Sequence, residues 1–117
     1  MDSEKLKFRT KQFALEIIRF FNILNRTDEG RILGKQLLRS STSVAANYRA
    51  ALRARSKQEF YAKLCIVDEE IDEALLWVEL INESGIINNS GIEVLKKEAE
   101  ELLYIFSSSR KTAKLNL

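Results

Sequence analysis

The stretch Lys57–Ser84, KQEFYAKLCIVDEEIDEALLWVELINES, decides the fold. Its apolar residues recur at alternating intervals of four and three, which places them on one face of a helix. These residues are Phe60, Leu64, Val67, Ile71, Ala74, Val78 and Ile81. A 4-3 seam of this length is typical of helices that pack along nearly parallel axes. The sequence therefore predicts a long helix over 57–84, packed lengthwise against others.

Three further segments carry a similar periodicity. Their seams are Phe13, Ile17, Phe20 and Leu24; then Leu33, Leu37, Ser41, Val44, Tyr48 and Leu52; then Leu95, Ala99, Leu102, Phe106, Ser109 and Ala113. We expect helices near 5–25, 29–55, 57–84 and 91–113, with a frayed tail over 114–117. Short connections force neighbouring helices to run antiparallel. The 117 residues suit one domain, so the prediction is all-α, a single up-down-up-down four-helix bundle over 1–117.

Local signals mark the helix ends. Ser56–Glu59 and Ser90–Glu93 each have the pattern of a capping box, in which a serine caps the helix and a glutamate follows three residues later. Gly85 stands where a helix C-terminus favours a left-handed residue. Thr27 or Asp28 can cap the second helix.

Composition excludes several kinds of chemistry. The chain has no proline, no histidine and one cysteine, Cys65, so it cannot form an internal disulfide and lacks the commonest general base and metal ligand. Di-iron bundles need Glu-x-x-His motifs. Met1–Thr10 has no apolar core of a signal peptide, and no apolar run reaches membrane-spanning length. We expect a cytoplasmic protein that is no enzyme and that has no metal, cofactor, small-molecule substrate or membrane partner.

The second helix contains an unusual run of hydroxyl residues, Ser40–Ser43. Serine and threonine are poor formers of helix interiors because they compete for backbone hydrogen bonds. One interpretation is that small side chains, here bonded back to the preceding turn, let two helices approach closely. The other is a hydroxyl-lined ligand or phosphate site.

Charge is strongly segregated along the chain. Residues 30–58 contain seven bases and no acid, whereas residues 59–83 contain eight acids and one base, Lys63. The seven bases are Arg31, Lys35, Arg39, Arg49, Arg53, Arg55 and Lys57. Most share one helical stripe, which could follow a nucleic-acid backbone, could pair with acids of a neighbouring subunit, or could simply be solvated. The net charge of +2 argues against a dedicated nucleic-acid binder.

The third helix has a second apolar face beside its seam. A bundle of this size cannot bury every side of a helix, so this face predicts an oligomer contact. Its residues are Ile66, Glu70, Glu73, Trp77 and Leu80. In that contact Arg39 or Arg49 of a neighbour would neutralise the two glutamates. The alternative is that Trp77 spans the edge of the core.

The segment 34–60, GKQLLRSSTSVAANYRAALRARSKQEF, resembles the four-helix bundle family encoded by intervening sequences of bacterial 23S ribosomal RNA genes. The likeness is most specific at 53–56, Arg-Ala-Arg-Ser, and continues through Trp77-Val-Glu-Leu80. The chain departs from the family pattern at Ala50, where glutamate is common, and at Ala45, where glycine is frequent.

The resemblance implies a homopentameric ring without assigned activity. A related branch is similar to the accessory protein of diversity-generating retroelements, a basic pentamer associated with nucleic acid and the reverse transcriptase. That role would fall here on Arg39, Arg49, Arg53, Arg55 and Lys57. Our expectation is a non-enzymatic oligomeric scaffold for interactions or nucleic acid. The alternatives are an RNA- or DNA-binding accessory protein that uses the second helix, and a purely structural self-assembling bundle.

Overall fold

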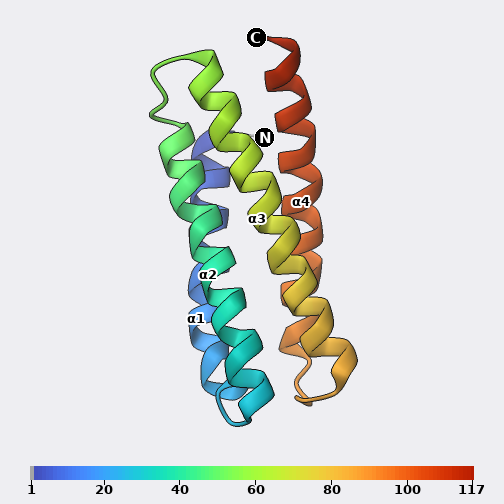
Figure 1. The fold of residues 1–117 in the computed structure, drawn as a ribbon. Coiled ribbons are helices and arrows are strands. Elements are labelled where there is room, and N and C mark those ends of the chain that lie inside the picture. The colour runs from blue at the N-terminus through green and yellow to red at the C-terminus, as the bar shows by residue number, and fades with distance from the viewer. Residues whose placement is uncertain (1) are drawn as a thin grey trace.

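Four α-helices make up most of the chain in a computed structural model, which describes residues 2–117. They are α1 (Ser3–Leu24), α2 (Asp28–Ala51), α3 (Lys57–Ser84) and α4 (Gly91–Leu115). The chain reverses direction at each connection, so that sequence neighbours run antiparallel (Figure 1). No strand occurs within residues 2–117. The prediction of an all-α, up-down-up-down four-helix bundle is confirmed.

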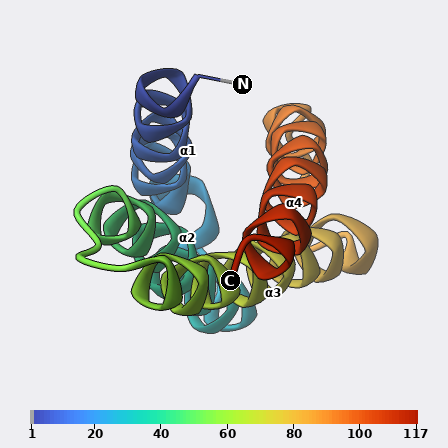
Figure 2. The ribbon, with the colours of Figure 1, turned by 90° about the horizontal axis from the view of Figure 1, so that it is seen from above.

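Seen along its axis, the bundle is an open arc (Figure 2). α2 packs extensively against α3, α3 against α4 and α1 against α2, whereas α1 and α4, at the two ends of the arc, make only a small contact. The molecule is 45 Å long and about half as wide. That length matches α3, because 28 residues rise about 42 Å at 1.5 Å per residue. The arc therefore has an α1–α2 side and an α3–α4 side, joined through the α2–α3 contact.

The predicted seams form the core. In α3 every seam residue from Leu64 to Ile81 is buried, and Phe60 is partly buried against the same cluster. Tyr48 of α2 meets Phe106 of α4, with 5.1 Å between the ring centroids. Such tilted aromatic pairs add to the stabilisation from buried area. The core therefore joins helices that are not sequence neighbours.

The hydroxyl run of α2 serves close packing. Ser40 and Ser41 are fully buried, and their hydroxyls donate to the carbonyls of Leu37 and Leu38, respectively, each at 3.3 Å. Thr42 likewise donates to the Leu38 carbonyl at 2.7 Å. These side-chain bonds satisfy each hydroxyl within its own helix. The interpretation as small, self-satisfied packing residues is confirmed for the buried Ser40 and Ser41, whereas Thr42 bonds within its helix but is exposed.

Three of the predicted end signals are present. The Thr27 hydroxyl accepts from the Gly30 amide at 3.0 Å and caps α2. The Ser56 hydroxyl accepts from the Glu59 amide at 3.0 Å and caps α3. Gly85 ends α3 with φ of 72°, a left-handed conformation that favours glycine.

The predicted end of the second helix is wrong. α2 stops at Ala51 rather than residue 55, and its last turn tightens as the amides of Arg53 and Ala54 bond three residues back, to Ala50 and Ala51. A helix to residue 55 would leave only Ser56 to reverse the chain into α3. Arg53 and Arg55 therefore lie in the connection and not on a helical stripe.

The predicted capping box at the start of α4 is also wrong. Ser90 has helical backbone angles and makes no side-chain cap bond. The Asn89 side-chain oxygen instead accepts from the Gly91 amide at 2.8 Å, and Glu93 accepts from Asn82 of α3 at 2.8 Å. An asparagine one residue earlier has taken the capping position, which releases Glu93 to bond across helices.

The two outer ends of the bundle extend further than expected. α1 begins at Ser3 because the Asp2 carboxylate accepts from the Glu4 amide at 2.9 Å. α4 continues to Leu115, beyond the expected end at 113, because Ala113 is buried against the core and holds the last turn. The expected frayed tail is therefore too long by two helical residues.

Candidate functional site

The two sides of the arc carry opposite charge. Residues 1–55 contain twelve lysines and arginines against five acids, whereas residues 56–117 contain seven against twelve. The chain therefore combines an α1–α2 side of about +7 with an α3–α4 side of about −5. A polyanion is attracted to the first side and repelled by the second.

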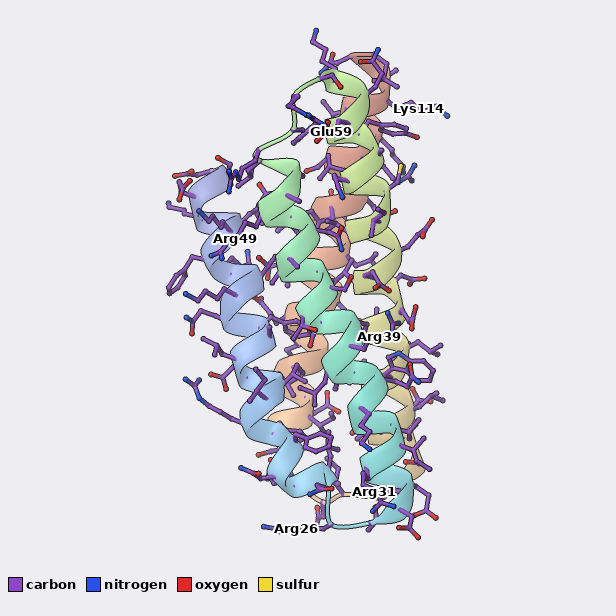
Figure 3. The ribbon with its side chains drawn as sticks, turned by 60° about the vertical axis from the view of Figure 1, so that its left-hand side comes forward. Arg26, Arg31, Arg39, Arg49, Glu59 and Lys114 are labelled. Carbon is purple, nitrogen blue, oxygen red and sulfur yellow. The ribbon has the colours of Figure 1, made fainter. Side chains whose placement is uncertain are left out.

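A groove of about 250 Å³ lies between α1 and α2. Three bases line it, Lys7 and Lys11 from α1 and Arg49 from α2. The remaining lining residues are small: Thr42, Ala45 and Ala46. Figure 3 shows Arg49 lying against the N-terminal half of α1, so the three cations converge from two helices. Because the intervening side chains are short, the charges stand at the rim of a hollow. We name these three bases and three small residues the α1–α2 groove.

The groove cations are not neutralised by the protein. Within residues 2–117, neither Lys7, Lys11 nor Arg49 forms an ion pair with a carboxylate. Three positive charges of this kind hold only mobile counterions, which an incoming anion displaces. The groove can therefore take a phosphate-sized anion with charge-assisted hydrogen bonds.

The structure divides the seven bases proposed for nucleic-acid binding. Arg49 belongs to the groove, and Lys35 is exposed on the same helix. Arg31 bonds to Asp28 of its own helix at 2.8 Å and lies at the opposite end of α2 (Figure 3). Three more bases cluster around the α2–α3 connection; these are Arg53, Arg55 and Lys57. Of these, Arg55 contacts Glu59 at 3.5 Å.

Arg39, the remaining predicted base, joins α2 to α3. Its guanidinium donates to Glu70 at 3.0 Å and closely to Glu73. Glu73 also accepts from the indole of Trp77 at 3.4 Å. Hydrogen bonding to Glu70 and then to Glu73 raises the pKa of Arg39 above its ordinary value. Arg39 is therefore a structural cation, and the two carboxylates already have their positive partner within one chain.

Some residues of the predicted oligomer face are exposed, whereas others pair or pack within the chain. Ile66 and Leu80 are exposed at 38 % and 43 %. Glu70, with a side chain only 14 % exposed, turns towards α2, and Trp77 packs partly against the core. The face that remains exposed on α3 carries Ile66, Leu76 and Leu80 beside Glu69, Asp72 and Glu83.

A second ionic cluster fixes α4 to α3. Asp68 accepts from the Ser107 hydroxyl at 2.6 Å and from the Arg110 guanidinium at 2.8 Å. The bond to Asp68 raises the pKa of Arg110 above its ordinary value. Nearby, a hydrogen bond to Cys65 is the main cause of a raised pKa of Tyr61. Asp68, Ser107 and Arg110 therefore link α3 to α4, and Cys65 of α3 is partly buried.

Lys7 and Lys11 line the groove but are not among the site residues that the sequence predicts. They precede the first apolar seam, in the N-terminal segment that lacks the apolar core of a signal peptide. The available signal was their four-residue spacing, which places both on one helical face. What sequence spacing could not show is that this face of α1 meets the C-terminal end of its antiparallel partner α2, where Arg49 lies.

Residues 2–117 lack two further features, a metal-binding cluster and a membrane-spanning helix. No group of three or more acidic or cysteine side chains is arranged to hold a metal ion. None of the four helices combines the length and apolarity that crossing a bilayer requires.

Comparisons with known proteins give a consistent result. The family model described as "23S rRNA-intervening sequence protein" matches residues 5–108. The chain is also similar to a crystal structure from Bacteroides thetaiotaomicron VPI-5482, described as a protein with unknown function from the S23 ribosomal protein family. The two share 30 % identity and a TM-score of 0.85, over 95 % of this chain and 99 % of the other. No curated protein matches.

Proposed function

The chain belongs to the family of 23S rRNA-intervening sequence proteins, and from this premise we propose that it is a cytoplasmic, non-enzymatic scaffold that assembles from identical copies and binds nucleic acid. The α1–α2 groove is the observation that carries the nucleic-acid part of the proposal. It offers three unpaired cations around small side chains. The absence of histidine from the sequence supports a role without acid–base catalysis.

The spacing of the groove cations suits the phosphates of a nucleic-acid strand. Lys7 and Lys11 lie one helical turn apart, and Arg49 faces them from the neighbouring helix. A chain of evenly spaced phosphates can meet all three, with Arg49 able to donate two parallel hydrogen bonds. Contacts of this kind fix the position of a nucleic acid without reading its bases. We therefore expect binding with little sequence preference.

The test is fluorescence anisotropy with a labelled oligonucleotide across a range of salt concentrations. Three phosphate contacts give a slope of log affinity against log salt of about −2 to −3. The triple variant Lys7→Glu, Lys11→Glu, Arg49→Glu should lose the binding and the slope. The matched control reverses three exposed lysines of α4 and should keep both; these are Lys97, Lys111 and Lys114. Equal losses in the two variants would refute a groove-specific role.

A second observation supports assembly. The exposed face of α3 places Ile66, Leu76 and Leu80 beside acids that have no ion pair within residues 2–117. A complementary basic and apolar face, with Ile32 and Lys35, lies about four turns along α2 from Arg49. Such unlike faces make head-to-tail contacts, which close into a ring when the rotation between neighbouring copies divides the circle evenly. We propose a homopentamer in which the α1–α2 groove stays open.

Solution mass tests the assembly independently of nucleic acid. Sedimentation equilibrium of the unmodified chain should give about five times its 13.5 kDa mass. Leu76→Asp and Leu80→Asp together should lower the mass by opposing burial of the α3 face. A monomer in the unmodified protein, or an unchanged mass in the variant, argues against this interface.

A further inference from the structure

We propose that the nucleic acid held by the α1–α2 groove is single-stranded and that Phe8 stacks on one of its bases. This inference rests on the proposed function and names the form of its ligand. Phe8 is 62 % exposed on α1, which leaves most of a large aromatic ring in water. It immediately follows Lys7, one of the groove cations.

Phe8 stands in a stretch of α1, residues 4–11, that carries three lysines and one arginine against a single acid, Glu4. Its ring lines a hollow of about 370 Å³ with Glu4, Lys5 and Arg9, and Lys11 lies one turn further along α1. Arg9 is bound to α4 through Glu98 and Glu101, at 2.6 Å and 3.1 Å, and so has a structural role. The two lysines of the groove, Lys7 and Lys11, are partly exposed and exposed, respectively, and neither forms an ion pair within residues 2–117. Phe8 thus lies beside a track of cations that continues into the groove.

The second strongly exposed aromatic residue gives the contrast. Tyr104 of α4 is 75 % exposed, but Glu100 and Glu101 precede it by one turn and no base lies within one turn of it. A polyanion is repelled from that position. Around Phe8 the single Glu4 is outnumbered by Lys5 and Lys11, each within one turn. Of the two rings, Phe8 alone combines an open face with positive surroundings, and this combination is how single strands are bound without sequence preference.

The stacking geometry distinguishes single strands from duplexes. In a duplex the base faces are covered by neighbouring base pairs, and only base edges reach the grooves. An aromatic ring on a helix surface can stack only on a base whose face is free. Lys7 and Lys11, with about 6 Å between their Cβ atoms, can hold successive phosphates of one strand while a base turns towards Phe8. The preferred ligand is therefore a flexible single strand.

Binding can be measured with three labelled probes of equal length: single-stranded oligothymidylate, an abasic strand with the same phosphates, and a duplex. Phe8→Ala should weaken binding to oligothymidylate about 5- to 150-fold, the loss expected for one stacked base. Its binding to the abasic strand should not change. Phe8→Trp should restore the affinity for oligothymidylate, and Tyr104→Ala should leave it unchanged. Helicity by circular dichroism shows that each variant remains folded.

The outcomes separate this inference from the proposed function. If reversing the three groove charges abolishes binding but Phe8→Ala acts equally on oligothymidylate and abasic strands, or on neither, the stacking inference is overturned and the groove remains. Tighter binding of the duplex than of the single strand also overturns it. If groove reversal changes nothing, the proposed function fails first.

Discussion

Arg39 gives the most direct test of how the bundle uses its charges. Replacing it with methionine keeps much of the side-chain length and removes the guanidinium that bonds to Glu70 and Glu73. The two carboxylates are one turn apart on α3 and would then repel each other without a cation between them. The variant should therefore weaken the α2–α3 contact, the most extensive in the bundle.

Exposure sets the size of the expected effect. The Arg39 side chain is 51 % exposed, while that of Glu70 is 14 % exposed. Fully exposed pairs contribute at most about 1 kcal/mol, and hydrogen bonds to charged groups about 1.5 to 3 kcal/mol. This pair lies between these cases, so Arg39→Met should lower the free energy of unfolding by about 1.5 kcal/mol, or about 6 °C in Tm. The coupling with Glu70→Gln in a double-mutant cycle should be about 1 kcal/mol.

Urea unfolding followed by Trp77 fluorescence is a suitable assay. Urea does not screen the ion pairs as guanidinium would, and Trp77 is the sole tryptophan, bonded to Glu73 itself. Repeating the measurement over about a 50-fold range of protein concentration separates pairing within a chain from pairing between subunits. A coupling that vanishes on dilution, or one below about 0.3 kcal/mol at every concentration, refutes the intrachain network.

Two further predictions concern single positions. A Cβ on Gly30 would clash with the Leu24 backbone carbonyl oxygen, so Gly30→Ala should destabilise the protein by about 2 kcal/mol in thermal unfolding. A Cβ on Gly34 would meet side-chain atoms only, the Phe21 ring at 2.9 Å and the Leu24 Cβ at 3.3 Å. Gly34→Ala should therefore change the stability by less than about 1 kcal/mol, because alanine also favours the helix. Burial, with the nearby charges of Asp2 and Glu4, raises the pKa of Tyr48. The stability that protonated Tyr48 contributes is therefore fully present below the unfolded-state pKa of about 10, and it is lost as pH rises through the folded-state pKa. Urea unfolding across pH 8 to 11 should show a smaller alkaline loss for Tyr48→Phe than for the unmodified protein, and parallel curves would contradict this reasoning.

Periodicity predicted the fold well because burial in a bundle depends on one repeating geometry. The 4-3 spacing alone was enough to predict that the seam residues from Leu64 to Ile81 are buried. Helix ends were harder because several residues compete for each capping position. At the start of α4 the competition was between Asn89 and Ser90, and only the backbone angles of Ser90 decide it. At the end of α2 the requirement to reverse the chain outweighed a favourable helical sequence.

The charged residues were the least predictable part of the site. A stripe on α2 contains Arg39 and Arg49 at equivalent-looking positions, yet one faces the acids of α3 and the other faces α1. Which base faces which neighbour depends on how α2 is rotated about its axis relative to α1 and α3. The sequence of α2 alone does not specify that rotation. Lys7 and Lys11 were missed for the same reason, since a groove belongs to a pair of helices.

Internal ion pairing explains how a nearly neutral chain can present a basic surface. Arg39 is used on the acids of α3, Arg110 on Asp68, and Arg9 on the acids of α4. Each of these contacts joins two helices and removes charge of both signs from the surface. What remains is unpaired lysine and arginine on the α1–α2 side and unpaired acid on the outer face of α3. A net charge of +2 spread evenly would attract a polyanion weakly at every point. Under the proposed function, the segregated charge orients the approach of a nucleic acid and of a second copy towards different faces, and salt should weaken both encounters.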